Sequence, residues 1–293
     1  TDFMKTNRTL GVVSVLTSAA FFGVLPVMTR AILEGGSSTF FTSFLRFFLS
    51  LLPLYIYLKI TKVDMKIERE DIRDIVIVTV FGYAGTTMLL FGSYNFIPSG
   101  LATTIHFLYP TFTVAGSIIF LKIKPDRRKI LCVILSLIGI LLFYSKGESE
   151  ISIIGMALAF LSGITYAFYT VFMGRTRVRK MPALKAIFYM NIVGSLMYLI
   201  LSVAFGKITF VLPGRIWLIS FIASVCTTFI GVFGYQIGVK HIGSENTAIL
   251  STFEPIMSII MGYIVYSESF TLKEIAGIIL ILLSTVIVAG SRD

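Results

Sequence analysis

Long apolar segments constrain this chain more than any other feature of its sequence. Hydrophobic residues make up 56% of the 293 residues and charged residues only 14%, which is about half the charged share of a soluble domain. A helix of about 20 apolar residues crosses the hydrocarbon core of a bilayer. We therefore expect an all-α polytopic membrane protein with ten transmembrane helices: Leu10–Leu33, Thr39–Leu58, Ile75–Tyr94, Ser99–Leu121, Ile130–Tyr144, Ile153–Met173, Ala183–Phe205, Ile216–Val239, Ser244–Tyr266 and Leu272–Gly290.

The fourth and ninth segments are related to each other in sequence. Residues 99–117 (SGLATTIHFLYPTFTVAGS) and 244–262 (SENTAILSTFEPIMSIIMG) align with an offset of 145, which places Pro110 on Pro255. Matches at nearly the same offset are Gly11 with Gly155, Ser18 with Ser162, and Ser50 with Ser195. A shared offset at several places indicates a duplication. The chain is predicted to consist of two five-helix repeats, residues 5–145 and 150–291.

An odd number of helices in each repeat places the two repeats in opposite orientations across the membrane. Inverted repeats around a central cavity are the architecture that many secondary transporters use for alternating access. The duplication therefore favours a transporter.

Basic residues are unevenly divided between the two sides of the predicted membrane. Of the 25 lysines and arginines, 19 fall on the side of the termini, five on the other side, and Arg46 lies within a span. Cytoplasmic loops are rich in Lys and Arg, so both termini are predicted to be cytoplasmic. This asymmetry accounts for the net charge of +10 without nucleic-acid binding. The polar stretch Lys59–Asp74 is expected to form a short surface element at the interface.

The fourth and ninth segments each carry one polar stripe at helical spacing. Polar side chains that face lipid are costly, so such stripes are expected to face the interior of the bundle. They favour a water-filled cavity over close helix packing because each stripe holds an ionisable residue, and the mid-span prolines Pro110 and Pro255 predict matching bends. The stripes are Ser99, Thr103, His106, Pro110, Thr113 and Ser117, and Ser244, Thr247, Ser251, Glu254, Ser258 and Gly262.

Glu254 is the most informative single residue. A carboxylate in the middle of a span must be paired, protonated or hydrated. We consider three roles: binding a cationic group, carrying a coupling proton, or forming a structural ion pair with Arg46. His106 is a second candidate for proton handling, with hydrogen-bonded packing as the alternative.

Other polar and aromatic residues within the spans could complete a cavity for a small amphiphilic metabolite. Tyrosine rings can hold an ammonium group, and their hydroxyls need partners. The further candidates are Tyr83, Tyr109, Tyr166, Tyr169, Gln236, Ser251 and Asn246.

No pattern in the sequence predicts a metal site, a cofactor site or a catalytic centre. Zinc needs three or four ligands, and neither an HExxH pattern nor a cysteine cluster is present. Cys132 and Cys226 lie singly in apolar spans and are expected to be buried thiols. A membrane enzyme is therefore disfavoured.

The chain resembles the drug/metabolite transporter superfamily, in particular ten-helix bacterial transporters with two EamA domains. The resemblance rests on Arg46-Phe47-Phe48, on the segments ending at Pro110 and Pro255, and on Glu268 with Lys273–Ile278. It implies a central cavity lined mainly by helices one, three, four, six, eight and nine, with helices five and ten peripheral. The first repeat departs from the pattern, because Lys122–Pro125 and Cys132 replace the acidic residue and the glycine.

Together these features predict a secondary transporter of a small organic solute in the plasma (inner) membrane, most simply an exporter of amino acids or related metabolites. A multidrug or organic-cation exporter is the main alternative. A nucleotide-sugar or phosphate-ester carrier is a lesser one, since Arg46 is the only clear intramembrane cation. The expected partners are the substrate, the bilayer and, if transport is coupled, protons, and the expected state is a monomer or homodimer.

Overall fold

The protein is a bundle of helices. The computed structural model describes residues 7–93, 96–97, 102, 105–122, 127–142, 152–266 and 272–290, and every regular element in these ranges is helical. The elements of the first repeat are α1 (Arg8–Glu34), α2 (Thr39–Phe48), α3 (Leu51–Ile60), α4 (Arg69–Val78), η1 (Thr79–Tyr83), α5 (Ala84–Ser93), α7 (Tyr109–Leu121) and α8 (Arg127–Leu142). Those of the second are α9 (Ile153–Met173), η2 (Arg177–Lys180), α10 (Ala183–Ala204), α11 (Gly214–Cys226), η3 (Thr227–Val232), α12 (Phe233–Leu250), η4 (Ser251–Phe253), α13 (Glu254–Tyr266) and α14 (Leu272–Gly290).

Gly243 lies at a kink within α12 and separates two spanning helices that follow each other without a loop. The apolar stretch Gly214–Phe253 has 40 residues and as one helix would be about 60 Å long, about twice the thickness of the hydrocarbon core. Gly243 breaks it with a φ of 80° and a ψ of 166°, a conformation that glycine adopts most readily. With this division, the described helices form the ten rods predicted from the sequence, and the polytopic fold is confirmed.

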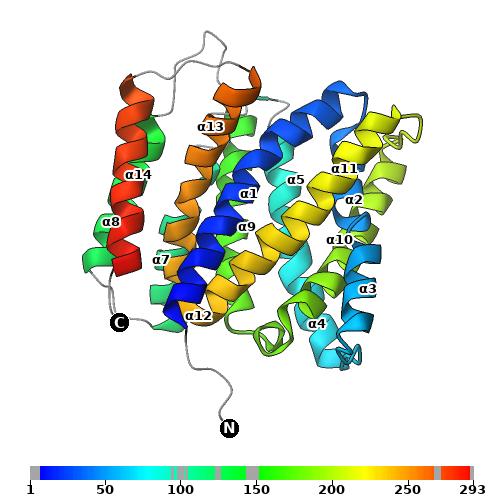
Figure 1. Cartoon of the computed structure of the whole chain (residues 1–293), viewed down its shortest axis with the longest axis horizontal. Helices are drawn as coiled ribbons and strands as arrows, with labels where there is room; N and C mark the ends of the chain where they lie inside the picture. The colour runs from blue at the N-terminus through cyan, green and yellow to red at the C-terminus, as the bar shows by residue number, and fades with distance from the viewer. Residues whose placement is uncertain are drawn as a thin grey trace.

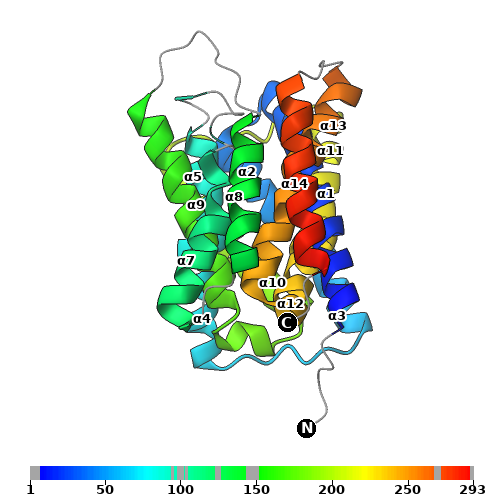
Figure 2. The same ribbon diagram turned by 90° about the vertical axis from the view of Figure 1, so that its left-hand side faces the viewer.

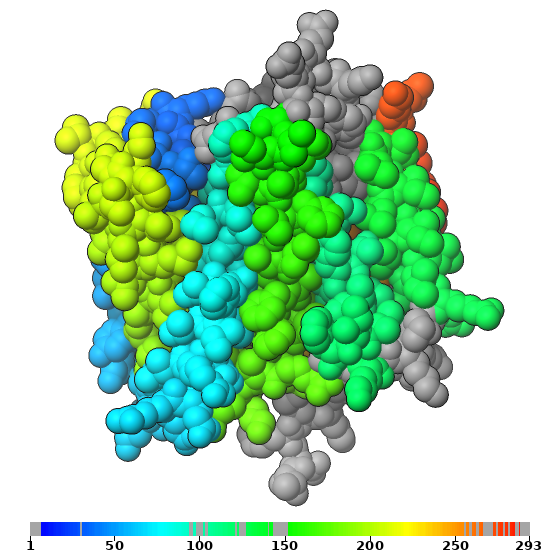
Figure 3. Space-filling view, turned by 180° about the vertical axis from the view of Figure 1, so that it is seen from behind, coloured from blue at the N-terminus to red at the C-terminus, as the bar shows by residue number. Residues whose placement is uncertain are grey.

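The rods of the two repeats are interleaved in space. In Figure 1, α1 lies against α12 and α13 of the second repeat. The corresponding first helix of the second repeat, α9, lies between the α4–α5 rod and α7 of the first repeat, as Figure 3 shows from behind. Helices α8 and α14 pack on each other at one edge of the bundle (Figures 1 and 2). Each repeat thus places its first helix among the helices of the other.

The two ends of the bundle are named here by their helix termini. Helix α1 begins at Arg8 and α14 ends at Gly290 at the lower end in Figure 1, which we call the terminal end. Helix α1 finishes and α2 begins at the opposite end.

Only the middle of the polar stretch Lys59–Asp74 forms a separate surface segment. Helix α3 continues to Ile60, and the third spanning rod already begins with α4 at Arg69. The first turn of α4 carries Glu70 and Asp71, and acidic residues favour a helix N-terminus. Asp71 also accepts a 3.0 Å hydrogen bond from the Glu68 N–H. Residues 61–68 form a largely exposed connector, and the acidic residues that follow stabilise the start of the third rod.

Matched glycines allow the interleaved helices to approach closely. A Cβ atom on Gly155 of α9 would lie 2.8 Å from Ile97, and one on Gly11 of α1 would lie 2.8 Å from Ile242. Both distances are shorter than real Cβ contacts allow. The Gly11–Gly155 match in the sequence therefore marks the same close contact in each repeat.

We expect Gly155→Ala to destabilise the protein by about 1–3 kcal/mol, the usual effect of overpacking. Gly116→Ala on α7 is the matched control, because its Cβ would meet its nearest neighbour at 3.6 Å and alanine favours the helix. Thermal unfolding in detergent measures both variants. Equal melting temperatures for the two variants would contradict the close approach.

Candidate substrate-binding site

Both bent helices are interrupted one turn before their proline. Residues 107–108 form a turn before α7, which has Pro110 as its second residue. In the second repeat the short 3₁₀ helix η4 precedes α13, whose second residue is Pro255. Proline is well tolerated in a first helical turn, where its missing N–H leaves no donor unpaired. The prolines therefore start the second half of each rod near the middle of the bundle.

The third and eighth rods carry a second pair of matched irregularities. Each contains one π-helical segment, η1 in the third rod and η3 in the eighth. The π geometry occurs mostly where function or packing requires it. Here Asn191 of α10 donates to Ser50 Oγ at 2.7 Å and to Thr228 Oγ1 of η3 at 3.4 Å, and the Ser18 hydroxyl donates to the Gly231 carbonyl at 2.6 Å. Side chains from inside the bundle thus stabilise η3.

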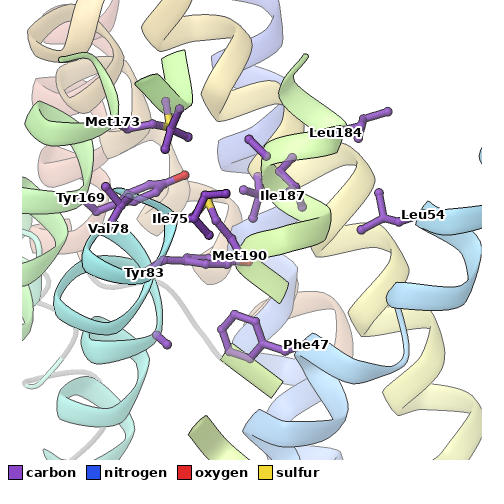
Figure 4. Close-up of a cluster of buried hydrophobic side chains, with 14 of the residues drawn as sticks. Phe47, Leu54, Ile75, Val78, Tyr83, Tyr169, Met173, Leu184, Ile187 and Met190 are labelled. Carbon is purple, nitrogen blue, oxygen red and sulfur yellow. The ribbon is translucent and has the colours of Figure 1, made fainter. Parts of the chain in front are cut away.

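A cluster of tyrosines lies where these irregular segments meet. The ring of Tyr166 on α9 is 4.6 Å from that of Tyr109, 5.6 Å from that of Tyr235 and 5.7 Å from that of Tyr169. Tyr169 stacks in turn on Tyr83 of η1 at 5.6 Å, and Figure 4 shows these two rings beside Phe47 and Met190. We call Tyr83, Tyr109, Tyr166, Tyr169 and Tyr235 the tyrosine cluster.

Two hydroxyl groups of the tyrosine cluster lie next to other polar side chains. The hydroxyls of Tyr109 and Tyr169 are buried and have no hydrogen-bond partner in the described part of the chain. They lie near Ser251 and Gln236, respectively. Buried polar groups are normally satisfied, so a polar guest between these rings would gain two hydrogen-bond partners.

Glu254 and Arg46 lie beside this cluster without forming an ion pair. Glu254 is within electrostatic range of Arg46 and of Tyr109, Tyr166 and Tyr235. Its carboxylate forms no hydrogen bond or ion pair with the residues described. The two groups thus interact electrostatically without direct contact.

His106 is held in place by the neighbouring rod. Its Nδ1 is 2.9 Å from Ser162 Oγ, and the Ser162 hydroxyl donates to the Ala159 carbonyl at 2.6 Å. Because that hydroxyl hydrogen is already used, Nδ1 must be the donor to Ser162. The ring also lies 5.5 Å from Tyr166, so His106 forms one wall of the tyrosine cluster.

The other predicted residues fall in two places. Ser251 is buried and donates back to the Thr247 carbonyl at 2.8 Å, and Gln236 is buried near Met190. Asn246 instead lies close to the terminal end, where it donates to the Ile242 carbonyl at 2.9 Å. Eight residues separate it from Glu254, about 12 Å along a helix, so the structure does not bring Asn246 to the tyrosine cluster.

Sequence reasoning missed Tyr235 and one half-buried ion pair. Tyr235 shares a 2.6 Å hydrogen bond with Thr170 Oγ1 and packs on both Tyr166 and Tyr169. The tripeptide Phe-Gly-Tyr, present at 81–83 and 233–235, was the signal that could have found it. Lys129 Nζ and Glu245 Oε2 pair at 2.8 Å and join α8 to α12 across the two repeats.

In the residues that the structure covers, no three His, Cys, Asp or Glu side chains are placed to hold a metal ion. The chemical groups at this site are aromatic faces, hydroxyls, one imidazole, one carboxylate and one guanidinium. Such a set has the chemistry that small polar or amphiphilic ligands require.

Comparison with known proteins gives the site its context. Residues 9–145 and 153–290 each match the EamA-like transporter family. An uncharacterized transporter of Synechocystis is 30% identical over 206 residues, which cover 67% of this chain and 60% of that protein, less than two thirds of its length.

Longer matches agree with this assignment. The uncharacterized inner membrane transporter YicL of Salmonella typhimurium is 27% identical over 286 residues, 95% of each chain. A solved crystal structure has the same fold, with a TM-score of 0.81 at 16% identity over 95% of this chain and 96% of that one. The chain belongs to the EamA-like transporter family, with one EamA-like segment in each of its two repeats.

Proposed function

We propose that this transporter exports amino acids or related metabolites across the plasma membrane by alternating access. The observation that carries the proposal is the unpaired Glu254 carboxylate beside the tyrosine cluster, where helices of both repeats meet. A substrate ammonium group would lie against the carboxylate and the tyrosine faces. The tyrosine hydroxyls would donate to its polar atoms.

An organic-cation exporter is the second candidate, because Glu254 and the tyrosines also suit a quaternary ammonium. The charge of Arg46 favours the first candidate. Its guanidinium acts on the same carboxylate and repels a purely cationic substrate, whereas a zwitterion has an anionic group to place beside it.

Alternating access requires one end of the bundle to close while the other opens. At the terminal end Arg177 of the second repeat contacts Glu68, Glu70 and Asp71 of the first, with 2.9 Å between Arg177 Nε and Asp71 Oδ1. We call these four residues the terminal clasp. Asp74 strengthens it by accepting a 3.2 Å hydrogen bond from the Arg177 backbone N–H.

The connectors at the opposite end meet through neutral groups. The Ser38 hydroxyl donates to the Lys207 carbonyl at 2.6 Å, and the rings of Phe40 and Phe205 stack at 5.3 Å. A cavity of about 590 Å³ lies beside them between α2, α5 and α10. We infer that the terminal clasp holds the cytoplasmic end closed in this conformation.

Exchange of labelled amino acids into proteoliposomes tests the proposed function. We expect Glu254→Gln to reduce the affinity for amino acids by about tenfold or more, equivalent to about 1.4 kcal/mol, because the carboxylate partner of the ammonium is lost. Asp64→Asn makes the same chemical change in an exposed connector and should leave exchange intact. If the vesicles take up quaternary cations but no amino acids, the first candidate is wrong and the second is supported.

Coupling to protons is tested in the same vesicles. If Glu254 carries the coupling proton, an imposed pH gradient drives uphill flux in the wild type, and Glu254→Gln abolishes that uphill flux. Uphill flux that is indifferent to the pH gradient would remove the proton from the mechanism.

Opening of the terminal clasp is measured by cysteine labelling. In a variant without Cys132 and Cys226, Met173→Cys places a thiol at a buried position at the end of α9. We expect Arg177→Ala to accelerate labelling by a membrane-impermeant maleimide several-fold, because exposed ion pairs at this end no longer join the repeats. The control is Arg69→Ala, an exposed arginine in the same region. Equal labelling rates in the two variants would show that the clasp does not hold this end closed.

A further inference from the structure

A small cavity lies on one side of Arg46, between α1, α2 and α11. Thr29, Thr42, Arg46 and Ser220 supply its polar lining. It has about 10 Å³ of room for the centre of a water-sized group, about enough for one oxygen atom.

Two polar atoms around this cavity have no partner among the described residues. They are Arg46 Nε, which can only donate, and Ser220 Oγ on a side chain that is 2% exposed. Among the residues that the structure describes, no carboxylate lines the cavity. A buried site that offers donors and positive charge but no acceptor of opposite charge has the chemistry of an anion site.

The guanidinium is held in position on its other sides. It lies 5.8 Å from the ring centroids of Phe22 and Phe47 and 6.0 Å from that of Tyr83. The Ser224 hydroxyl donates to the Arg46 carbonyl at 2.5 Å, which anchors the backbone of α2. An Arg fixed by aromatic rings is prepared for a planar carboxylate.

We propose that Arg46 and Ser220 form a carboxylate subsite that binds the α-carboxylate of a zwitterionic substrate whose ammonium lies at Glu254. This assignment rests on the proposed function, because it takes Glu254 and the tyrosine cluster as the ammonium site. It explains why Arg46 and Glu254 lie within electrostatic range without closing an ion pair: the substrate bridges them. The subsite distinguishes amino acids from amines.

Binding to the purified full-length protein tests the subsite with matched probes. Leucine and phenylalanine are compared with their decarboxylated analogues, isoamylamine and phenethylamine. We expect Arg46→Gln to weaken amino acid binding about tenfold or more and to leave amine binding unchanged or tighter. Ser220→Ala should weaken only the amino acids, by a smaller factor, and Arg46→Lys should restore part of the loss.

Arg215→Gln is the matched control, since Arg215 is an exposed arginine near the start of α11. If Arg46→Gln does not fold, Ser220→Ala and Arg46→Lys carry the test. Equal weakening of amino acids and amines by these variants would overturn the subsite while leaving the proposed function intact. Binding of amines but not of amino acids to the wild type would overturn both.

A free anion such as chloride shares the chemistry of a carboxylate and is tested separately. The wild type is titrated with leucine in chloride and in gluconate buffers. Competition between chloride and leucine, lost in Arg46→Gln, would support the subsite. Chloride binding at Arg46 that leaves the affinity for leucine unchanged would overturn the carboxylate assignment.

Discussion

The hydrocarbon layer offers no water to a polar group, and the architecture of this protein follows from that constraint. Backbone groups freed by an irregular turn must find partners inside the bundle. The turn before Pro110, η4 before Pro255, and the π-helical segments η1 and η3 all lie within the bundle. Asn191 and the Ser18 hydroxyl contact η3 directly. Irregular backbone is therefore concentrated where it is shielded from lipid, which is also where a substrate can meet it.

The interleaving of the repeats limits which parts of the transporter can move as rigid bodies. Because α1 packs on α12 and α13, and α9 on α5 and α7, neither repeat can rotate as a separate body without displacing the first helix of the other. The contacts between connectors are therefore better candidates for gates. They are charged at the terminal end, in the terminal clasp, and neutral at the opposite end, around Ser38 and Phe40. We expect ionic strength to act on the first set far more than on the second.

The scaffold is symmetrical, but its chemistry is not. Tyr109 occupies the position that Glu254 has in the second repeat, and Arg46 corresponds to Asn191. Asn191 is buried and its amide donates to Ser50, while its Oδ1 has no partner among the described residues. The buried Nε of Arg46 likewise has no acceptor among them. The duplicated frame thus holds a neutral amide and a cation at equivalent places, and this difference makes the chemistry of the two repeats unequal.

The sequence by itself determined the ten helices, the duplication and the two charged residues near the middle of a span, Arg46 and Glu254. These features are local, because each apolar run reports that a helix faces lipid and each proline reports that a helix is interrupted. Only the tertiary structure decided which residues meet. Tyr235 joined the tyrosine cluster, Asn246 lay a dozen ångströms or so along the helix from Glu254, and Glu245 paired with Lys129. Such pairings depend on how closely the rods cross. The close contacts at Gly11 and Gly155 set that distance between helices that are far apart in the chain. No periodicity within one helix encodes these pairings.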